Sequence, residues 1–192
     1  HVQIDVKELG VDLLSASAHK FNGPKGIGFL YIKKGTPITS YISGGAQEFG
    51  MRAGTENVAS IVGMAVALKK NCDNLAENMQ HVENIESHLI DKLSSSGLDF
   101  VRNGSPQHIP GNVSLSFKNA DGEALLHRLD LKGICVSTGA ACDTTNTQIS
   151  HVLHAINLDP EYAIGTIRIS FSPKNTLSEV ETICDHIVRI IC

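Results

Sequence analysis

The sequence predicts an α/β chain in two parts: strands and turns over residues 1–55, then a compact α+β unit over residues 56–192. Before residue 56, hydrophobic residues form short apolar runs broken by glycine, which is typical of buried strands and their turns. After residue 56 they recur first at helical spacing and then in alternation with polar residues, which indicates helices followed by mixed strands and helices. With 192 residues, of which 42% are hydrophobic, the chain is long enough to bury such a core.

Two short strands are expected between residues 11 and 32. The stretch VDLLSAS is apolar and then small, and IGFLYI is a continuous apolar run, as expected for buried strands of a largely parallel sheet. The glycines and the proline between these stretches predict a turn. Residues 33–54, with four glycines from Gly44 to Gly54, are expected to form a loop.

Helical spacing of hydrophobic residues predicts two helices after Glu56. The residues that define the two patterns are Val58, Ile61, Val62 and Ala65, and then Val82, Ile85, Leu89 and Leu93. A polar stretch separates the patterns, and Gly97 is expected to end the second helix.

Strands and helices alternate in the remainder of the chain. Strands are expected at 113–117 and 167–171, where hydrophobic and polar residues alternate, and at GICVS, residues 133–137. Helices are expected at 124–129 and 147–156. The last helix opens with a capping box formed by Thr176 and Glu179, and its apolar face carries Val180, Ile183, Ile187 and Ile190. Strands that are covered by helices on one side would make this part a compact α+β unit.

Charge and hydrophobicity exclude several classes of protein. The formal net charge is −4 and the basic residues are dispersed, which argues against a nucleic-acid partner. The longest apolar stretch, residues 59–68, is followed by Lys69 and Lys70 and is too short to span a bilayer. The opening HVQIDVKELG lacks the features of a signal peptide and has no methionine, so a mature piece or a fragment is expected.

The cysteines argue against a secreted protein. The five of them form an odd set with no C-x-x-C pair. A secreted scaffold held by disulfides would have a denser and even-numbered set. Reduced thiols in a cytoplasmic protein are therefore expected.

Lys20 occupies an unusual position, between a run of small residues and a turn rich in glycine. Burial disfavours the charged form of a lysine, and a neutral amine can attack a carbonyl group to form a Schiff base. Pyridoxal phosphate requires such a lysine together with hydroxyl and imidazole groups, which Ser17 and His19 would supply from the same face of a strand. From these residues alone, a lysine that caps a loop is the simpler interpretation. A phosphate-binding loop is a weaker one, because residues 23–28 match neither common glycine motif.

Four segments resemble the cysteine desulfurases of the NifS/IscS type, in the class V aminotransferase family: SASAHKFNGPKGIGFLYI, GGAQEFGMRAGTENVASIVGMAVAL, GICVSTGAACD and IRISFS. They occur in the same order and with similar spacing as in that family. The resemblance implies the C-terminal half of a pyridoxal phosphate enzyme of fold type I, the fold of aspartate aminotransferase. Residues 1–55 would be the C-terminal part of the cofactor domain, with the end of its sheet. Residues 56–192 would be a small α+β domain that carries the catalytic cysteine loop.

The resemblance implies a cofactor site around Lys20. In the family the matching lysine carries pyridoxal phosphate, and the residues that match Ser17 and His19 contact its phosphate. Thr55 matches a threonine that reaches the phosphate bound in the partner subunit of a homodimer. The family residues that hold the pyridine ring come earlier in its members and have no counterpart here, so this chain alone is expected to be inactive.

The resemblance also implies a substrate site. Arg168 matches the arginine that binds the carboxylate of L-cysteine, and Cys142 matches the cysteine that receives its sulfur. The reaction releases L-alanine and leaves a persulfide on the enzyme. The family passes this sulfur to acceptors such as an iron–sulfur scaffold or a tRNA-thiolation enzyme, without direct contact to nucleic acid or membrane.

Simpler interpretations remain for three of these residues. Arg168 could be the solvated side of a strand, and Thr55 could be the N-cap of the helix that follows it. Cys142 lies in a small polar stretch that predicts a mobile loop, which suits a sulfur acceptor, although free cysteines are more often buried.

The other cysteines suit structural positions. Cys135 is expected in a strand of the core, Cys184 and Cys192 in the final helix, and Cys72 at the end of a helix. Two of the cysteines, 135 and 142, are followed by histidines at 151 and 154, but zinc sites prefer tighter cysteine spacing, so no metal is expected.

Two alternatives to a cysteine desulfurase stay open. A selenocysteine lyase or another fold-type I enzyme would share the fold, although the GAAC segment argues against an aminotransferase. From a different class, the chain could be a non-catalytic module that binds sulfur-transfer partners.

Overall fold

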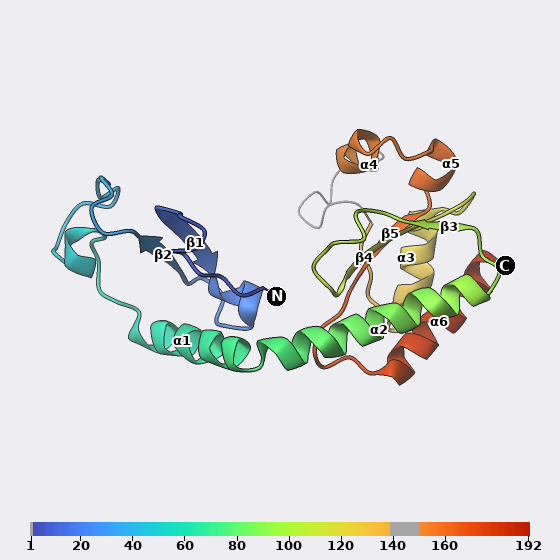
Figure 1. Cartoon of the computed structure of the whole chain (residues 1–192), viewed down its shortest axis with the longest axis horizontal. Coiled ribbons are helices and arrows are strands. Elements are labelled where there is room, and N and C mark those ends of the chain that lie inside the picture. Colours follow the sequence, from blue (N-terminus) through green and yellow to red (C-terminus); the bar gives the residue numbers. More distant parts are fainter. Residues whose placement is uncertain (1, 139–149) are drawn as a thin grey trace. The chain divides into compact units, whose positions relative to one another are not determined.

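The computed structural model describes residues 2–138 and 150–192, so the candidate sulfur acceptor Cys142 lies outside the described residues. The chain divides into two compact units, Val2–Leu75 and Ala76–Cys192 (Figure 1). This division falls later than the boundary expected at residue 55, because helix α1 (Val58–Asp73) packs within the first unit.

The first unit contains the two expected strands and the first expected helix. Its elements before α1 are β1 (Leu13–Ser17), the 3-10 helix η1 (Ala18–Phe21), β2 (Gly28–Ile32) and the 3-10 helix η2 (Glu48–Gly50).

Strands β1 and β2 pair antiparallel, with Leu13 opposite Ile32 and Ser17 opposite Gly28. This pair is thus antiparallel, whereas strands of a largely parallel sheet were expected. The connection between the strands is too short for the crossover that parallel strands require, so it reverses the chain instead. Leu13 and Leu30 are each 48% exposed, so the pair is not buried by the residues of this unit.

Helix α1 packs against η1 and the turn that follows it. The Asn71 side chain donates from Nδ2 to the Phe21 carbonyl oxygen at 2.8 Å. A Cβ at Gly63 would lie 2.9 Å from Cγ of Pro24, so the glycine allows the helix to approach the turn closely. The segment that contains Lys20 is therefore held from one side by α1.

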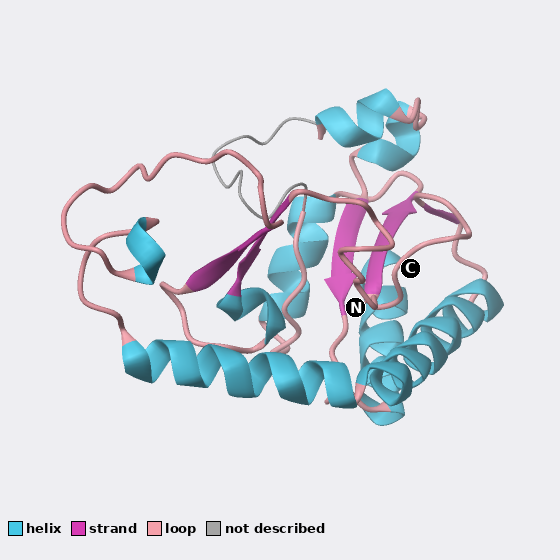
Figure 2. Ribbon diagram, turned by 60° about the vertical axis from the view of Figure 1, so that its left-hand side comes forward, coloured by secondary structure: helices cyan, strands magenta, loops and turns pink. Residues whose placement is uncertain are grey.

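The second unit combines one sheet with five helices among its described residues (Figure 2). Its elements are α2 (Leu75–Ser95), β3 (Phe100–Arg102), β4 (Asn112–Phe117), α3 (Gly122–Asp130), α4 (His151–Ala155), α5 (Pro160–Ala163), β5 (Thr166–Ser170) and α6 (Leu177–Ile191). The helices expected from Val82 to Leu93, at 124–129 and at the C-terminus are confirmed, as is the capping box of Thr176 and Glu179. Of the helix expected at 147–156, the described part forms only α4.

The sheet of the second unit has the strand order β3-β4-β5 and is antiparallel throughout. The prediction of a strand at 133–137 is wrong. This segment contributes a single bridge, between Ser137 and Arg168. The preceding residues instead complete the turn after α3, where the Gly133 N–H donates to the Asp130 carbonyl oxygen at 2.8 Å. Only the last residue of the segment is left to pair with β5.

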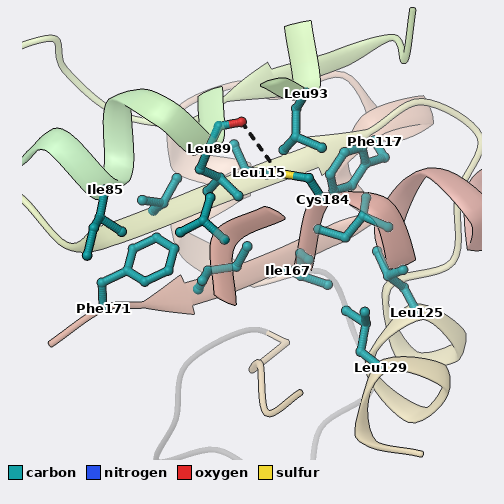
Figure 3. Packing of buried hydrophobic residues seen from close by; sticks show 14 of the residues in the cluster. Ile85, Leu89, Leu93, Leu115, Phe117, Leu125, Leu129, Ile167, Phe171 and Cys184 are labelled. Atoms are coloured by element: carbon teal, nitrogen blue, oxygen red, sulfur yellow. Dashed lines mark hydrogen bonds between the residues drawn. The ribbon is translucent and has the colours of Figure 1, made fainter. Parts of the chain in front are cut away.

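One face of this sheet carries the hydrophobic core (Figure 3). Side chains of β4 and β5, such as Leu115 and Ile167, pack with Leu89 of α2, Cys184 of α6 and Leu129 of α3, and all five are fully buried. The expected α+β unit is confirmed, because helices α2, α3 and α6 all contribute to this core. The whole set of fully buried large side chains is Phe117, Ile85, Leu89, Leu93, Leu115, Leu125, Leu129, Ile167, Ile187, Val113, Val180 and Cys184.

An ion-pair network joins α2 to α6 at the surface of the second unit. Lys92 contacts the carboxylates of Glu181 and, at 2.9 Å, of Asp185, and Nε2 of His88 also contacts Glu181. The hydrogen bonds that Lys92 donates to Glu181 and Asp185 raise its pKa from 10.5 to about 12. The same contacts, first from Lys92 and then from His88, lower the pKa of Glu181 below 4.5.

Replacing Glu181 with glutamine is expected to lower the midpoint of thermal unfolding by about 1–4 °C at neutral pH. Because the pKa of Glu181 is lowered on folding, its contribution to stability is present above pH 4.5 and is lost as the pH falls through the lower value of the folded state. Midpoints measured by circular dichroism at several pH values should therefore converge for the wild type and the variant in acid. Glu77→Gln, at an exposed position in the first turn of α2, is the control. A gap that persists in acid would contradict the proposed role of the charge.

Candidate active site

The residues expected to bind the cofactor lie on one short segment of the first unit. Ser17 is the last residue of β1, whereas His19 and Lys20 lie in η1. The expectation that Ser17 and His19 share one face of a strand is wrong, because the strand ends at Ser17 and a 3-10 turn follows. The turn is anchored by Ala18, which is fully buried and whose N–H donates to the Ile27 carbonyl oxygen at 3.0 Å.

Two glycines shape the space beside this turn. Gly28 lies directly opposite Ser17, and a Cβ at Gly28 would lie 2.4 Å from the Ala16 carbonyl oxygen. A Cβ at Gly23 would lie 2.9 Å from Cβ of Ala18. The glycines therefore permit the close return of the chain, and they leave the position across from Ser17 without a side chain.

Ser17, His19 and Lys20 are all exposed in the described unit. The expectation that Lys20 is partly desolvated is therefore not met by residues 2–75 themselves. The donor set nevertheless fits pyridoxal phosphate, since a hydroxyl and an imidazole can hold its phosphate while an amine reaches its carbonyl carbon.

Thr55 is exposed and lies in the loop before α1. It is not the N-cap of that helix, because the N-cap is Asn57, whose side chain accepts from the Ser60 N–H at 3.3 Å. The simpler interpretation of Thr55 is therefore wrong.

The loop before Thr55 contains glycines with positive φ angles and one buried alanine. Gly44, Gly50 and Gly54 all have positive φ angles, of 148°, 77° and 108°. Ala53 is only 5% exposed, and its N–H donates to the Ile42 carbonyl oxygen at 3.3 Å. The loop thus folds back on itself around Ala53, which suits a binding element better than a simple connector.

Arg168 lies at the centre of β5 in the second unit and is half-buried. Its backbone is paired on both sides, with Ser114 of β4 and with Ser137. None of the ion pairs formed within residues 2–138 and 150–192 includes Arg168. Its guanidinium is therefore placed on a half-open face of the sheet with its charge available to an anion.

The cysteines differ partly from their expected positions. Cys184 is buried as expected, and burial raises the pKa of its thiol to about 11, which makes it a poor nucleophile. Cys135 is exposed and lies outside any strand, so its expected core position is wrong. Cys72, in α1, and Cys192, just after α6, are also exposed.

The described residues contain no group of three histidine, cysteine or carboxylate side chains placed to hold a metal. The weighed zinc site includes Cys142, so this finding does not test it. Within the same described part, no helix combines the length and hydrophobicity that crossing a membrane requires.

A polar cluster on the face of the sheet that carries Arg168 was not expected from the sequence. Asn103 donates from Nδ2 to the hydroxyls of Ser114 and Ser116, at 3.1 and 2.7 Å, and the Ser116 hydroxyl contacts that of Thr166 at 2.6 Å. Ser116 and Thr166 are buried, although alternation in their strands suggests a solvated face. The only available signal was the concentration of small hydroxyl residues in β4 and β5.

The described residues thus offer two separate candidate features: a turn shaped by glycines that presents Lys20 in the first unit, and a sheet that presents Arg168 in the second. The chain belongs to the aminotransferase class-V family, whose model matches residues 1–183.

The chain resembles cysteine desulfurases within that family. It is 43% identical over 194 residues to the cysteine desulfurase IscS of Clostridium botulinum, and the match covers 100% of this chain and 49% of the relative. A solved NifS-like protein superposes with a TM-score of 0.84 at 40% identity, over 97% of this chain and 48% of that one. A structure described as SspA in complex with cysteine superposes with a TM-score of 0.66 at 30% identity, over 90% of this chain and 47% of that one. The chain thus spans about half the length of these relatives.

Proposed function

We propose that this chain is the C-terminal half of a pyridoxal phosphate enzyme that removes sulfur from L-cysteine and releases L-alanine. The observation that carries the proposal is the arrangement of Ser17 at the end of β1, opposite Gly28, which has no side chain, with His19 and Lys20 in the turn that follows. The choice of substrate is supported by the cysteine desulfurases among the relatives and by the neighbour that was solved with cysteine.

Residues 1–55 would form the C-terminal part of the cofactor domain. Lys20 Nζ would bind the carbonyl carbon of the cofactor, and Ser17 Oγ and the His19 ring would bind its phosphate. When bound, pyridoxal phosphate supplies an electron sink that weakens the bond between carbon and sulfur. Once free, Lys20 Nζ would carry the α-proton of the substrate.

Residues 56–192 would bind the substrate and accept its sulfur. The Arg168 guanidinium offers a planar pair of N–H groups that matches both oxygens of a carboxylate. The thiolate of Cys142 would attack the substrate sulfur, so that a sulfur–sulfur bond forms while the carbon–sulfur bond breaks. The electron pair of the broken bond stays on the carbon, which takes up a proton and leaves as L-alanine. The persulfide on Cys142 would then pass to an iron–sulfur scaffold or a tRNA-thiolation enzyme.

A homodimer would complete the cofactor site through Thr55. The glycine loop before Thr55 supports this assignment, as do the aromatic side chains of Tyr41 and Phe49, which are fully exposed in the described unit. Exposed aromatic residues are enriched where subunits meet. The four described cysteines are free thiols, which supports the expected cytoplasmic location.

The proposal is tested with a full-length protein that contains this sequence, reconstituted with pyridoxal phosphate and incubated with L-cysteine and a thiol reductant. L-alanine and sulfide should appear in equal amounts. Turnover of L-selenocysteine without any reaction of L-cysteine would favour a selenocysteine lyase instead. Failure to bind the cofactor at all would favour a non-catalytic module.

Replacing Arg168 with lysine is expected to raise the KM for L-cysteine about tenfold or more, because lysine keeps the charge but cannot form two parallel hydrogen bonds. The kcat should change less, since the carboxylate is bound alike in the ground state and the transition state. Steady-state kinetics of the full-length protein measures both constants, with Arg189→Lys, at an exposed position of α6, as the control. An unchanged KM would leave Arg168 as the solvated side of its strand.

A further inference from the structure

A row of polar side chains crosses the sheet of the second unit at Arg168. Ser114 lies opposite Arg168 on one side, and Ser137 lies opposite it on the other. Asn103 extends the row beyond Ser114, because its N–H donates to the Ser114 carbonyl oxygen at 2.9 Å and its side chain contacts the Ser114 hydroxyl. Residues directly opposite each other in an antiparallel sheet share one face, so all four side chains lie on the same face. All four residues are half-buried.

The backbone hydrogen bonds show how closely Ser114 and Arg168 approach each other. The N–H and the carbonyl oxygen of Arg168 both bond to Ser137, at 2.6 and 3.0 Å. In an extended strand the N–H and the carbonyl oxygen of one residue point to the same side. Those of Arg168 point to Ser137, so Arg168 and Ser114 form a pair without backbone hydrogen bonds. In such a pair the Cα atoms are about 4.5 Å apart, and the side chains are closer than in the hydrogen-bonded kind. Of the two residues opposite Arg168, Ser114 is therefore the one in the more closely spaced kind of pair.

The direction of the hydrogen bonds leaves the Ser114 proton free. Thr166 donates from Oγ1 to the Ala163 carbonyl oxygen at 2.8 Å, since a carbonyl can only accept. The single proton of Thr166 is thus used, so Ser116 must donate to Thr166. The proton of Ser116 is then used as well, which means that Asn103 must present its NH2 group to Ser116 and to Ser114. Ser114 accepts from this NH2 group, and among residues 2–138 and 150–192 no acceptor takes its own proton, which can therefore be donated to a ligand.

We infer that Ser114 and Ser137 are substrate-binding residues, which flank Arg168 and donate hydrogen bonds to the carboxylate that it binds. The inference rests on the proposed function for the identity of that carboxylate. An ionised carboxylate has about four acceptor sites, of which a bidentate guanidinium fills two, so two flanking hydroxyls can occupy the others. Asn103 is a positioning residue, because its side chain amide bonds to the Ser114 hydroxyl and thereby orients it.

The test uses the full-length protein with the variants Ser114→Ala and Ser137→Ala. Each is expected to raise the KM for L-cysteine about tenfold, the loss expected for one hydrogen bond to a charged group, and to leave kcat within about twofold. Ser114→Thr, which retains a hydroxyl, should keep the wild-type KM. Ser170→Ala is the matched control, because this exposed serine lies two residues along β5, on the same face but outside the row.

Binding of propionate, followed through the side-chain NMR resonance of Arg168 in protein with isotope-labelled arginine, gives a readout that needs no turnover. Ser114→Ala should weaken propionate binding about tenfold. Asn103→Ala should weaken it to a similar extent in the wild type but should have little further effect in Ser114→Ala, because it acts through that hydroxyl. A wild type that binds propionate but does not release alanine would overturn the proposed function alone. Unchanged KM and propionate affinity in both serine variants would overturn the inference alone.

Discussion

Replacing Lys20 with alanine in the full-length protein is expected to abolish stable cofactor binding and to lower kcat at least about a thousandfold. Lys20 shares with His19 the turn that directly follows Ser17 at the end of β1, and the proposed reaction uses its Nζ twice. It first holds the cofactor and then carries the α-proton, so one substitution removes two functions. Absorbance of the bound cofactor after gel filtration measures the first effect, and alanine release measures the second.

Lys25→Ala is the matched control for this prediction. Lys25 is an exposed lysine in the same connection between β1 and β2, but it lies outside η1. Its loss should leave cofactor retention and kcat unchanged, which separates a specific amine from the general positive charge of the turn. Full retention of the cofactor in Lys20→Ala, or an equal loss in Lys25→Ala, would contradict the assignment of Lys20.

The second unit could be predicted from its sequence, because its hydrophobic residues pack mainly against each other. Leu89 in α2, Leu115 in β4 and Cys184 in α6 each lie on the hydrophobic face of their own element, and all three pack in one core. The start of α6 was also predictable, since the capping box of Thr176 and Glu179 is a local interaction. Where partners are local or share one core, the sequence pattern carries enough information.

The first unit was predicted less well, because an apolar run does not specify which surface covers it. The run at 27–32 predicts a strand but neither its direction nor its burial, and the observed partner is antiparallel. The change from strand to 3-10 turn after Ser17 depends on burial of Ala18, which is a tertiary contact. The exposure of Lys20 likewise depends on surfaces outside its own segment.

Two residues of the second unit show why alternation in a strand can mislead. Ser116 is one of the polar residues that alternate with hydrophobic ones at 113–117, but α5 packs against β4 and the Thr166 hydroxyl accepts a hydrogen bond from Ser116 in its buried position. Cys135 was expected in the core because a strand was predicted at 133–137, yet the turn after α3 takes up part of that segment and Cys135 is exposed. In both cases a neighbouring element, which the pattern does not reveal, decides the exposure.

Replacing Cys142 with serine in the full-length protein is expected to abolish sulfide release from L-cysteine while leaving cofactor absorbance intact. A serine hydroxyl is nearly isosteric with a thiol, but it does not accept sulfur, so binding should survive and transfer should not. Peptide mass spectrometry after brief incubation with L-cysteine should find the additional sulfur on Cys142 in the wild type. The same experiment should find none on the corresponding peptide of the variant.

Cys135→Ser is the control for this prediction. Cys135 is exposed and lies seven residues before Cys142 in the sequence, so it is the competing thiol that the experiment must exclude. Cys184 is not a comparable candidate, because burial raises the pKa of its thiol to about 11 and keeps it protonated at neutral pH. If Cys142 is the acceptor, Cys135→Ser should retain full sulfide release and the label on Cys142. Normal turnover in Cys142→Ser, with the sulfur found on Cys135, would transfer the role of acceptor to Cys135.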